Sequence, residues 1–361
     1  MPIPIYVAIT AHGFGHATRT AALIDRLLAI APDVLPIFVT TAPRWLIEKY
    51  VHCHFLHRPR ALDVGVVQSD SLTMDLPATA SKLADLRSQA DAIVRAEADF
   101  IRLNRVRLVL ADIPPLACAI AKAADVPCWM AGNFGWDFIY RAFGAEFKAD
   151  ADWMAELYGQ CDRLFRLPFY EAMTAFPHRE DVGLTGGDAA LTAEQLRQKL
   201  GLAGDRPTVL LTFGGLGVDA IPYENLAAYP DWQFVSLDCD VPDLPNLMRL
   251  DGQQWRPVDI MPACTQVLIK PGYGTISEAM KAGVPLRCLT RMGFAEAPIL
   301  LDGIRQHSHH QILSRSQVFE QAWDWLEHPF APPESDKPLA SDGNQVIAEA
   351  IATFLTPLKR T

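Results

Sequence analysis

The chain lacks the cysteine patterns of disulfide-rich and zinc-binding proteins. Its seven cysteines are scattered, odd in number and without a CxxC pair, so we expect neither a disulfide framework nor a zinc site at conventional spacing. The histidine-rich stretches 52–57 and 307–310 have no carboxylate pattern of a known metal site beside them, and we therefore predict no bound metal. Reduced, mostly buried thiols are typical of a cytoplasmic protein, which is the localisation we expect.

Long apolar runs and clustered positive charge are also missing. The apolar runs are broken within about a dozen residues, short of the ~20 needed to cross a bilayer, and the first residues show no signal peptide. Lys and Arg number 32 against 42 Asp and Glu, with no extended basic run, so nucleic acid is not an expected partner. Peripheral membrane contact stays open, with Trp45, Leu46 and Ile47 as candidates, although burial is the commoner fate of such residues.

What the sequence does contain is a repeated alternation of short apolar runs and amphipathic stretches. A strand at 5–10, a helix at 17–30 and a strand at 34–39 predict a βαβ unit and hence a parallel sheet. Further strands are predicted at 107–111, 128–131, 208–213, 233–237, 267–270 and 286–289, with helices at 116–124, 192–200 and about 344–355. The pattern predicts an α/β protein with two Rossmann-like domains that face each other across a cleft.

The 361 residues suffice for about two domains. Glycine and proline punctuate the middle of the chain, and a proline-rich stretch precedes the last helix. We therefore predict a first domain at 1–165, a linker region at 166–206, a second domain at 207–330, and a linker with a C-terminal helix at 331–361.

The first motif is AHGFGHATR at residues 11–19. Gly13 and Gly15 allow the backbone to turn sharply off the strand and to approach a ligand closely, and the helix that follows presents unpaired N–H groups. The motif does not complete GxGxxG because residue 18 is Thr, and the second strand ends in Thr40-Thr41-Ala42 without an acidic residue. Binding of a nicotinamide dinucleotide is therefore disfavoured.

Two histidines and an aspartate stand at one edge of the predicted first sheet. His16 opens the helix after the first strand, and a neutral imidazole suits a general base. Asp112 directly follows a buried strand and would orient His16 if the two strands are neighbours. The plainer interpretations are a turn histidine for His16 and, for Asp112, the cap of a helix that begins near Pro114. His12, at the strand end, is a candidate for an acceptor pocket.

The motif IKPGYGTISEAMKAGVP at residues 269–285 predicts an anion site. A strand delivers Lys270, a glycine turn follows, and a helix opens close by, so that backbone N–H groups, the helix dipole and one cation suit a diphosphate. Glu278 is misplaced for phosphate and suits a pair of ribose hydroxyls; a solvated glutamate on a capped helix is the alternative. The candidate diphosphate residues are Lys270, Gly272, Tyr273, Gly274 and Thr275.

Two glycine-containing turns add candidates. TFGGLG at 212–217 places Gly214 and Gly215 at the head of the second domain, where they could admit phosphate or ribose. NFGWDFIY at 133–140 combines Asn133, Trp136 and Asp137 at a strand exit, and these are candidates for the acceptor pocket. Aromatic core is the expected role of the two phenylalanines in that stretch.

The pairing of GFGHATR with KPGYGTISEA some 260 residues later resembles the glycosyltransferases of the B fold (GT-B). GFGHATR, LDVGVVQSDSLTMD (62–75), DIPPLACAIAKAADVP (112–127) and NFGWDFIY are similar to the glycosyltransferase-like N-terminal region of plant L-arabinokinases. The resemblance implies that the second domain holds the nucleotide sugar, with Glu278 on the ribose and the 272–275 loop on the diphosphate, and that the first domain takes the acceptor. It also implies that His16 is the catalytic base and Asp112 its partner, with an inverted anomeric product.

Together these observations predict a glycosyltransferase that uses a nucleotide-diphosphate sugar, most simply a UDP-sugar, and an acceptor hydroxyl. Direct displacement needs neither a metal nor a cofactor, because Lys270, backbone amides and a helix dipole can stabilise the leaving diphosphate. Two alternatives stay open: an epimerase or phosphorylase that acts on a sugar nucleotide, and a non-catalytic sugar-nucleotide sensor or scaffold. A dehydrogenase is the least favoured alternative.

Overall fold

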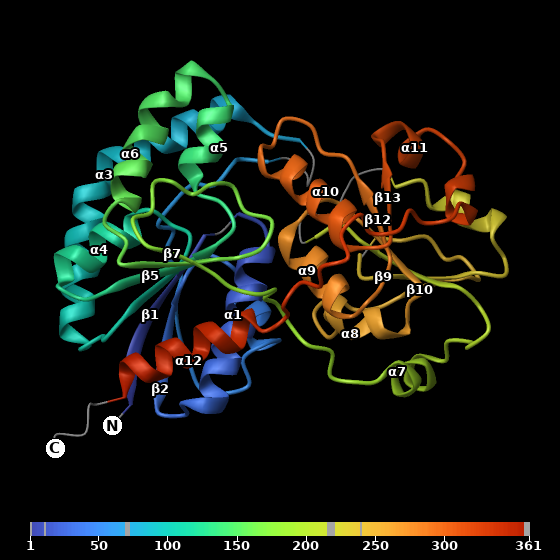
Figure 1. The fold of residues 1–361 in the computed structure, drawn as a ribbon, viewed down its shortest axis with the longest axis horizontal. Coiled ribbons are helices and arrows are strands. Elements are labelled where there is room, and N and C mark those ends of the chain that lie inside the picture. Colours follow the sequence, from blue (N-terminus) through green and yellow to red (C-terminus); the bar gives the residue numbers. More distant parts are fainter. Residues whose placement is uncertain (1, 11, 69–72, 215–220, 239, 357–361) are drawn as a thin grey trace.

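The computed structural model describes residues 2–10, 12–68, 73–214, 221–238 and 240–356. They form two α/β halves that lie side by side, the first coloured blue to green and the second yellow to orange in Figure 1. Each half is built around one sheet, and every pairing between the named strands is parallel. The predicted α/β class with two Rossmann-like domains is confirmed.

The first sheet has seven strands in the order β3-β2-β1-β4-β5-β6-β7. Its central strands are buried on both faces, which explains their continuous apolar runs. The strands are β1 (Ile3–Ile9), β2 (Val34–Val39), β3 (Leu56–Arg58), β4 (Val109–Asp112), β5 (Cys128–Gly132), β6 (Arg163–Arg166) and β7 (Arg179–Asp181). The helices are α1 (Gly15–Ile30), α2 (Arg44–Glu48), α3 (Leu76–Leu103), α4 (Leu116–Ala124), α5 (Trp136–Ala142) and α6 (Lys148–Tyr158).

The second sheet has six strands in the order β10-β9-β8-β11-β12-β13. They are β8 (Thr208–Thr212), β9 (Gln233–Ser236), β10 (Leu247–Arg249), β11 (Gln266–Ile269), β12 (Leu286–Leu289) and β13 (His310–Leu313). The helices are α7 (Ala193–Leu200), α8 (Pro257–Ile260), α9 (Tyr273–Lys281), α10 (Glu296–His307) and α11 (Arg315–Phe319). In each sheet the order of the strands reverses next to the strand that comes first in the chain, between β1 and β4 in one sheet and between β8 and β11 in the other. Ligands of open α/β sheets bind at such switch points.

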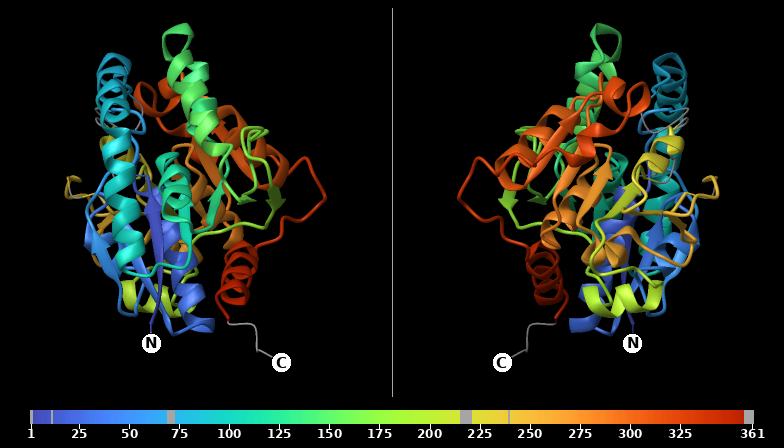
Figure 2. Two further views of the ribbon diagram at one scale, coloured as in Figure 1. Left: turned by 90° about the vertical axis from the view of Figure 1, so that its left-hand side faces the viewer. Right: turned by 90° about the vertical axis from the view of Figure 1, so that its right-hand side faces the viewer.

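The chain crosses between the halves twice. It first passes from β7 to β8, through a segment that contains α7. After the second sheet, residues 331–342 run down the outside of the molecule to α12 (Gly343–Leu355), which packs against α1 of the first half (Figures 1 and 2). The last helix therefore fastens the end of the described chain to the half in which it began.

In the described part of the chain, no helix combines the length and the apolar character that crossing a membrane requires. The residues considered for membrane contact face inward: Leu46 and Ile47 are buried, and Trp45 is half-buried beside a pocket between the halves. The aromatic and aliphatic side chains of this segment thus serve packing and pocket walls.

Candidate active site between the two halves

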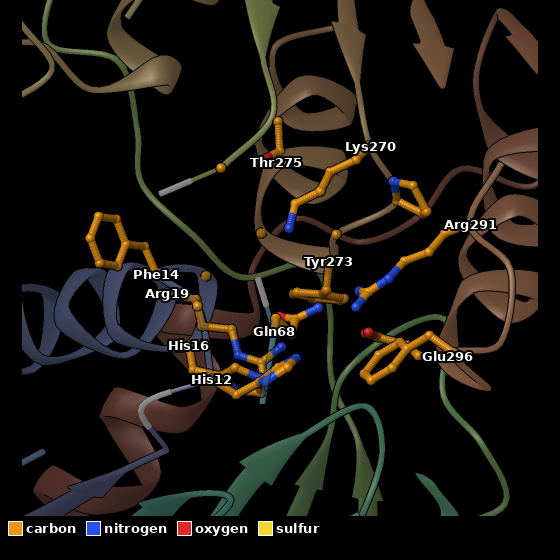
Figure 3. Close-up of a pocket in the computed structure, with 17 residues that line it drawn as sticks. His12, Phe14, His16, Arg19, Gln68, Lys270, Tyr273, Thr275, Arg291 and Glu296 are labelled. Atoms are coloured by element: carbon orange, nitrogen blue, oxygen red, sulfur yellow. The ribbon is translucent and has the colours of Figure 1, made fainter. Parts of the chain in front are cut away.

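The central cleft lies where the two switch points face each other, and it encloses about 700 Å³. The first half contributes the β1–α1 turn and one side chain of the 62–68 loop, and the second half contributes the strand exits and the helix starts that follow β11 and β12. Figure 3 shows Lys270 and Arg291 extending from the second half toward His12, His16 and Arg19. The lining residues are His12, Gly13, Phe14, Gly15, His16, Arg19, Gln68, Gly214, Lys270, Pro271, Gly272, Tyr273, Gly274, Thr275, Arg291, Phe294 and Glu296.

His16 and Asp112 are in contact, because the strands that precede His16 and end in Asp112 are adjacent in the sheet. β1 pairs with β4 in a register that sets Ile9 opposite Asp112, so the turn after β1 brings His16 over the carboxylate. The His16 Nδ1 lies 2.8 Å from the Asp112 Oδ1. Arg19 Nη2 also lies 3.0 Å from this nitrogen. Because an ionised carboxylate can only accept and its contact is the shorter one, we assign the proton to Nδ1, which leaves the lone pair on Nε2. His16 is 7% exposed and lines the cleft, so this nitrogen has the form of a general base.

Arg19 holds the same carboxylate from the other side. Its Nε donates to Asp112 Oδ2 and its Nη2 to Asp112 Oδ1, each at 2.6 Å, and Thr20 Oγ1 donates to Oδ2 at 2.8 Å. With His16, four donors converge on two oxygens, and the carboxylate is fixed in position. Burial alone would raise the pKa of Asp112, but the adjacent Arg19 and His16 outweigh it and lower the pKa, so Asp112 stays ionised.

The network continues across the cleft through Asn133. Arg19 Nη1 donates to Asn133 Oδ1 at 3.0 Å, and Asn133 Nδ2 donates to Glu296 Oε1 at 2.7 Å. Asn133 follows β5 of the first half, whereas Glu296 opens α10 of the second. The Arg19 guanidinium also lies 5.0 Å from the centre of the Tyr273 ring on α9. A continuous chain of buried polar contacts therefore links His16 to the second half.

His12 has the opposite tautomer to His16. The Val66 N–H donates to His12 Nδ1 at 3.2 Å, so the ring proton is on Nε2. Burial lowers the pKa of His12 well below its usual value, and the neighbouring His16, Arg291 and Lys270 add to the effect. His12 is thus a neutral donor in the cleft and is unsuited to act as a base.

The other two candidates for the acceptor pocket lie deeper. Trp136 is fully buried, packs edge-on beneath the His12 ring at 5.2 Å, and donates from Nε1 to Asp63 Oδ2 at 2.9 Å. Asp137 lies in the first turn of α5, and neither residue lines the central cleft. Trp136 supports the floor of the site through His12, whereas the half-buried Asp137 lines neither of the two pockets.

The N-terminus of α9 meets the N-terminus of α1. A Cβ placed on Gly274 would lie 3.7 Å from the Gly15 carbonyl oxygen and 3.8 Å from the Gly15 Cα, which are ordinary contact distances, so the two helix starts lie next to each other. The first-turn N–H groups of α9, after its N-cap Gly272, border the cleft together with Lys270. Two helix N-termini and a cation at one point favour an anion. The Tyr273 hydroxyl, by contrast, points away and accepts from Thr185.

A second pocket of about 1290 Å³ adjoins the central cleft and shares Phe14, Gly15, Gly214, Gly274 and Thr275 with it. Glu278 lines this pocket from the second turn of α9, and its Oε1 accepts from the Gly187 N–H at 2.9 Å. Burial raises the pKa of Glu278 to about 7. The other lining residues are Thr18, Trp45, Leu46, Lys49, Tyr50, Thr212, Leu237, Asp238, Asp251, Gly252, Gln253, Trp255 and Pro257.

The structure brings most of the predicted site residues to these two spaces. His12, Gly13, Gly15, His16, Gly214, Lys270, Gly272, Tyr273, Gly274 and Thr275 line the central cleft, Glu278 lines the second pocket, and Asp112 and Asn133 lie just beneath. Gly215 falls outside the described residues. In the described ranges, no three His, Cys, Asp or Glu side chains gather in a way that would hold a metal ion.

The sequence interpretation missed Arg19, Arg291 and Glu296. A signal existed for Arg19, which stands three residues after His16 and hence on the same face of α1. Arg291 follows β12, and Glu296 opens α10 a few residues later. Both residues therefore lie where a strand ends and a helix begins, at the same sheet edge as the other site residues. The predicted strand at 286–289 would have indicated this position.

Comparison with solved structures shows the fold. CalG4, the calicheamicin glycosyltransferase, superposes with a TM-score of 0.62 at 15% identity, covering 99% of both chains. UDP-glucose:anthocyanidin 3-O-glucosyltransferase, solved with UDP, gives 0.57 at 11% identity, with 99% of this chain and 96% of that chain covered. UGT89C1 of Arabidopsis thaliana, solved with quercetin, gives 0.59 at 16% identity, with 99% and 91% covered. The chain therefore has the GT-B fold, as predicted.

In sequence, the chain is 33% identical over 302 residues to the L-arabinokinase of Arabidopsis thaliana. The match covers 81% of this chain and 28% of the kinase, so the chain spans little more than a quarter of that relative's length. The predicted resemblance to B-fold glycosyltransferases and to a plant L-arabinokinase is confirmed. No family model matches the chain.

Proposed function

We propose that the protein is a glycosyltransferase that moves a sugar from a nucleoside-diphosphate sugar, specifically a UDP-sugar, to an acceptor hydroxyl. The observation that carries the proposal is the position of His16, which rests on Asp112 and faces the N-terminus of α9 and Lys270 across the central cleft. A base and an anion site on opposite walls of one cleft are what transfer from a diphosphate leaving group needs. Solved relatives of this fold bound to UDP support the choice of nucleotide.

The reaction is a single displacement. His16 Nε2 takes the proton of the acceptor hydroxyl, and the acceptor oxygen forms a bond to the anomeric carbon as the bond from that carbon to the diphosphate oxygen breaks. The diphosphate leaves with the bonding electron pair, and the first-turn amides of α9 and the Lys270 ammonium stabilise its charge. Attack opposite to the leaving group inverts the anomeric configuration, and the step uses no metal.

The surrounding residues orient the reactants. The ionised Asp112 stabilises the imidazolium that forms on His16, and Arg19 and Thr20 keep the carboxylate in place. The neutral His12 donates a hydrogen bond to the acceptor or to the sugar. The second pocket, which is continuous with the α9 N-terminus, holds the nucleoside, and Glu278 accepts from the ribose hydroxyls.

The test is to incubate the protein with a panel of UDP-sugars and small hydroxylated acceptors and to follow UDP release and product by chromatography and mass spectrometry. We expect His16→Ala to lower kcat by about 10²–10⁴-fold while the Kd for UDP, measured by calorimetry, stays within about twofold. Epimerised nucleotide sugar in the absence of acceptor would contradict glycosyl transfer. Unchanged turnover in His16→Ala would remove His16 as the base.

A further inference from the structure

The second pocket has one wall from each half of the molecule. Its first-half wall is formed mainly by the end of α2 and the residues that follow it, Trp45, Leu46, Lys49 and Tyr50. The opposite wall is the 251–257 segment between β10 and α8, together with Glu278. The proposed mechanism leaves the first-half wall without a role.

Lys49 spans the two walls. Its Nζ donates to the carbonyl oxygens of Gly252 and Trp255, each at 2.6 Å, although these residues are more than 200 positions away. An ammonium has three N–H donors, so two bonds to backbone leave the third for another acceptor. Because Lys49 lines the pocket, a ligand there is within reach of this donor.

Two tryptophans contact Lys49, Trp45 through its ring and Trp255 through its backbone carbonyl. The ring of Trp45 is held edge-on by Phe14 at 5.7 Å, and its centre lies 5.6 Å from the Lys49 ammonium. Trp255, whose carbonyl accepts from Lys49, lines the opposite wall. Flat aromatic side chains beside a hydrogen-bond donor suit a nucleobase, which offers a π-face and ring carbonyl oxygens.

We propose that Trp45 and Lys49 are nucleotide-binding residues supplied by the first half, so that both halves hold the base of the nucleoside diphosphate. Trp45 contacts the face of the base, and the third N–H of Lys49 donates to a carbonyl oxygen of the base. The nucleotide then binds well only when the two halves are joined by Lys49. This inference rests on the proposed function, since it assigns residues to the nucleotide end of the same site.

The protonation of Lys49 gives a second readout. Burial and the nearby Arg256 lower the pKa of Lys49 to about 8, against the opposing effect of Asp259, Asp251 and Glu278. Above this pH the neutral amine keeps only two N–H groups, both of which Gly252 and Trp255 occupy. Affinity for a nucleotide should therefore fall as the pH rises from 7.5 to 8.5, a range in which Glu278 is already mostly ionised.

The experiment measures the Kd for UDP by calorimetry with the full chain. We expect Lys49→Met and Trp45→Leu each to raise the Kd about tenfold or more, and Lys49→Met to abolish the fall in affinity between pH 7.5 and 8.5. The matched control is Lys199→Met: Lys199 lies 4.9 Å from the Trp255 ring centre but does not line the pocket, and its Kd should equal the wild-type value. Thermal unfolding without ligand checks that each variant is folded, and Lys49→Arg tests whether charge alone suffices if Lys49→Met is unstable.

The outcomes separate the inference from the proposed function. If the wild-type chain binds UDP and both pocket variants bind it equally well, the first-half wall does not hold the base, and the inference is wrong while the function stands. If neither UDP nor any other nucleoside diphosphate binds the wild-type chain, both are wrong. Weaker binding in Lys49→Met and Trp45→Leu with an unchanged Lys199→Met supports the inference.

Discussion

The two walls of the central cleft use different chemistry at equivalent places in the fold. The first half places a side-chain network at its switch point, with His16, Arg19 and Thr20 on Asp112. The second half places backbone N–H groups at the start of α9 and the cations Lys270 and Arg291 on its side of the cleft. Both arrangements follow from the same strand order.

In the proposed reaction the two walls have different tasks. A base must hold one nitrogen within a few tenths of an ångström of a proton, so its partners are buried, charged and fully hydrogen-bonded. A diphosphate has many equivalent oxygens, so amides and a long side chain can bind it with less exact placement. The first wall should therefore be intolerant of substitution, and the second tolerant.

The largest effect is expected when Arg19 is replaced by Met. The variant leaves the buried Asp112 carboxylate without its bidentate partner, which should lower the free energy of unfolding by about 3–5 kcal/mol. Urea denaturation measures it. Arg26→Met is the control, because Arg26 is an exposed residue of the same helix and should change stability by no more than about 0.5 kcal/mol. A loss below about 1 kcal/mol for Arg19→Met would show that the first wall is not the rigid network described above.

Lys270→Met should have a smaller effect, confined to ligands with a diphosphate. We expect the Kd for UDP to rise about 10–100-fold, an energy of about 1.4–2.8 kcal/mol, while stability changes little because the Lys270 side chain lines the open cleft. Calorimetry with UDP and with uridine compares the two ligands, and uridine should bind the variant and the wild type alike. An equal loss for uridine would mean that Lys270 supports the nucleoside instead.

Glu278→Gln should have the smallest effect below about pH 5, and one that grows as the pH rises. Because burial raises the pKa of Glu278 in the folded protein to about 7, the folded state binds a proton that the unfolded state releases near pH 4.5. The wild type therefore loses stability as the pH rises from about 4.5 through 7, whereas the neutral glutamine, which can still accept from the Gly187 N–H, does not. The free energies of unfolding of the two proteins should nearly coincide at pH 4.5, and at pH 8 that of Glu278→Gln should be higher by about 3 kcal/mol. Urea-unfolding midpoints that stay equal at pH 8 would contradict the raised pKa.

Most of the fold was predictable, because many segments carry a pattern of apolar residues that marks them as a buried strand or helix. The strand at 34–39 and the helix at 116–124 were predicted with their observed bounds, because continuous or periodic apolar residues mark them. The 28-residue α3 was not predicted, and only six of its residues are buried. β7, with the sequence RED, has no apolar residue and is a strand only through its pairing with β6.

The candidate site was likewise predictable only where its residues belong to a local sequence pattern. The turn glycines, His16 and Lys270 stand out because each follows a strand that leads into a helix. The contacts of Lys49 with Gly252 and Trp255, and of Glu278 with Gly187, join segments about 90 to 200 residues apart. Nothing in the local sequence of either partner indicates them.

The sequence by itself determined where the strands and helices fall and which chemical groups stand at the ends of the strands. Burial of apolar side chains and backbone preferences act between near neighbours in the chain, and they leave a readable period. Only the tertiary structure decided that Arg19 shares Asp112 with His16, that Asn133 reaches Glu296, and that Lys49 joins the two halves. A buried charge or amide is stable only beside its partner, and packing of distant segments is what supplies that partner.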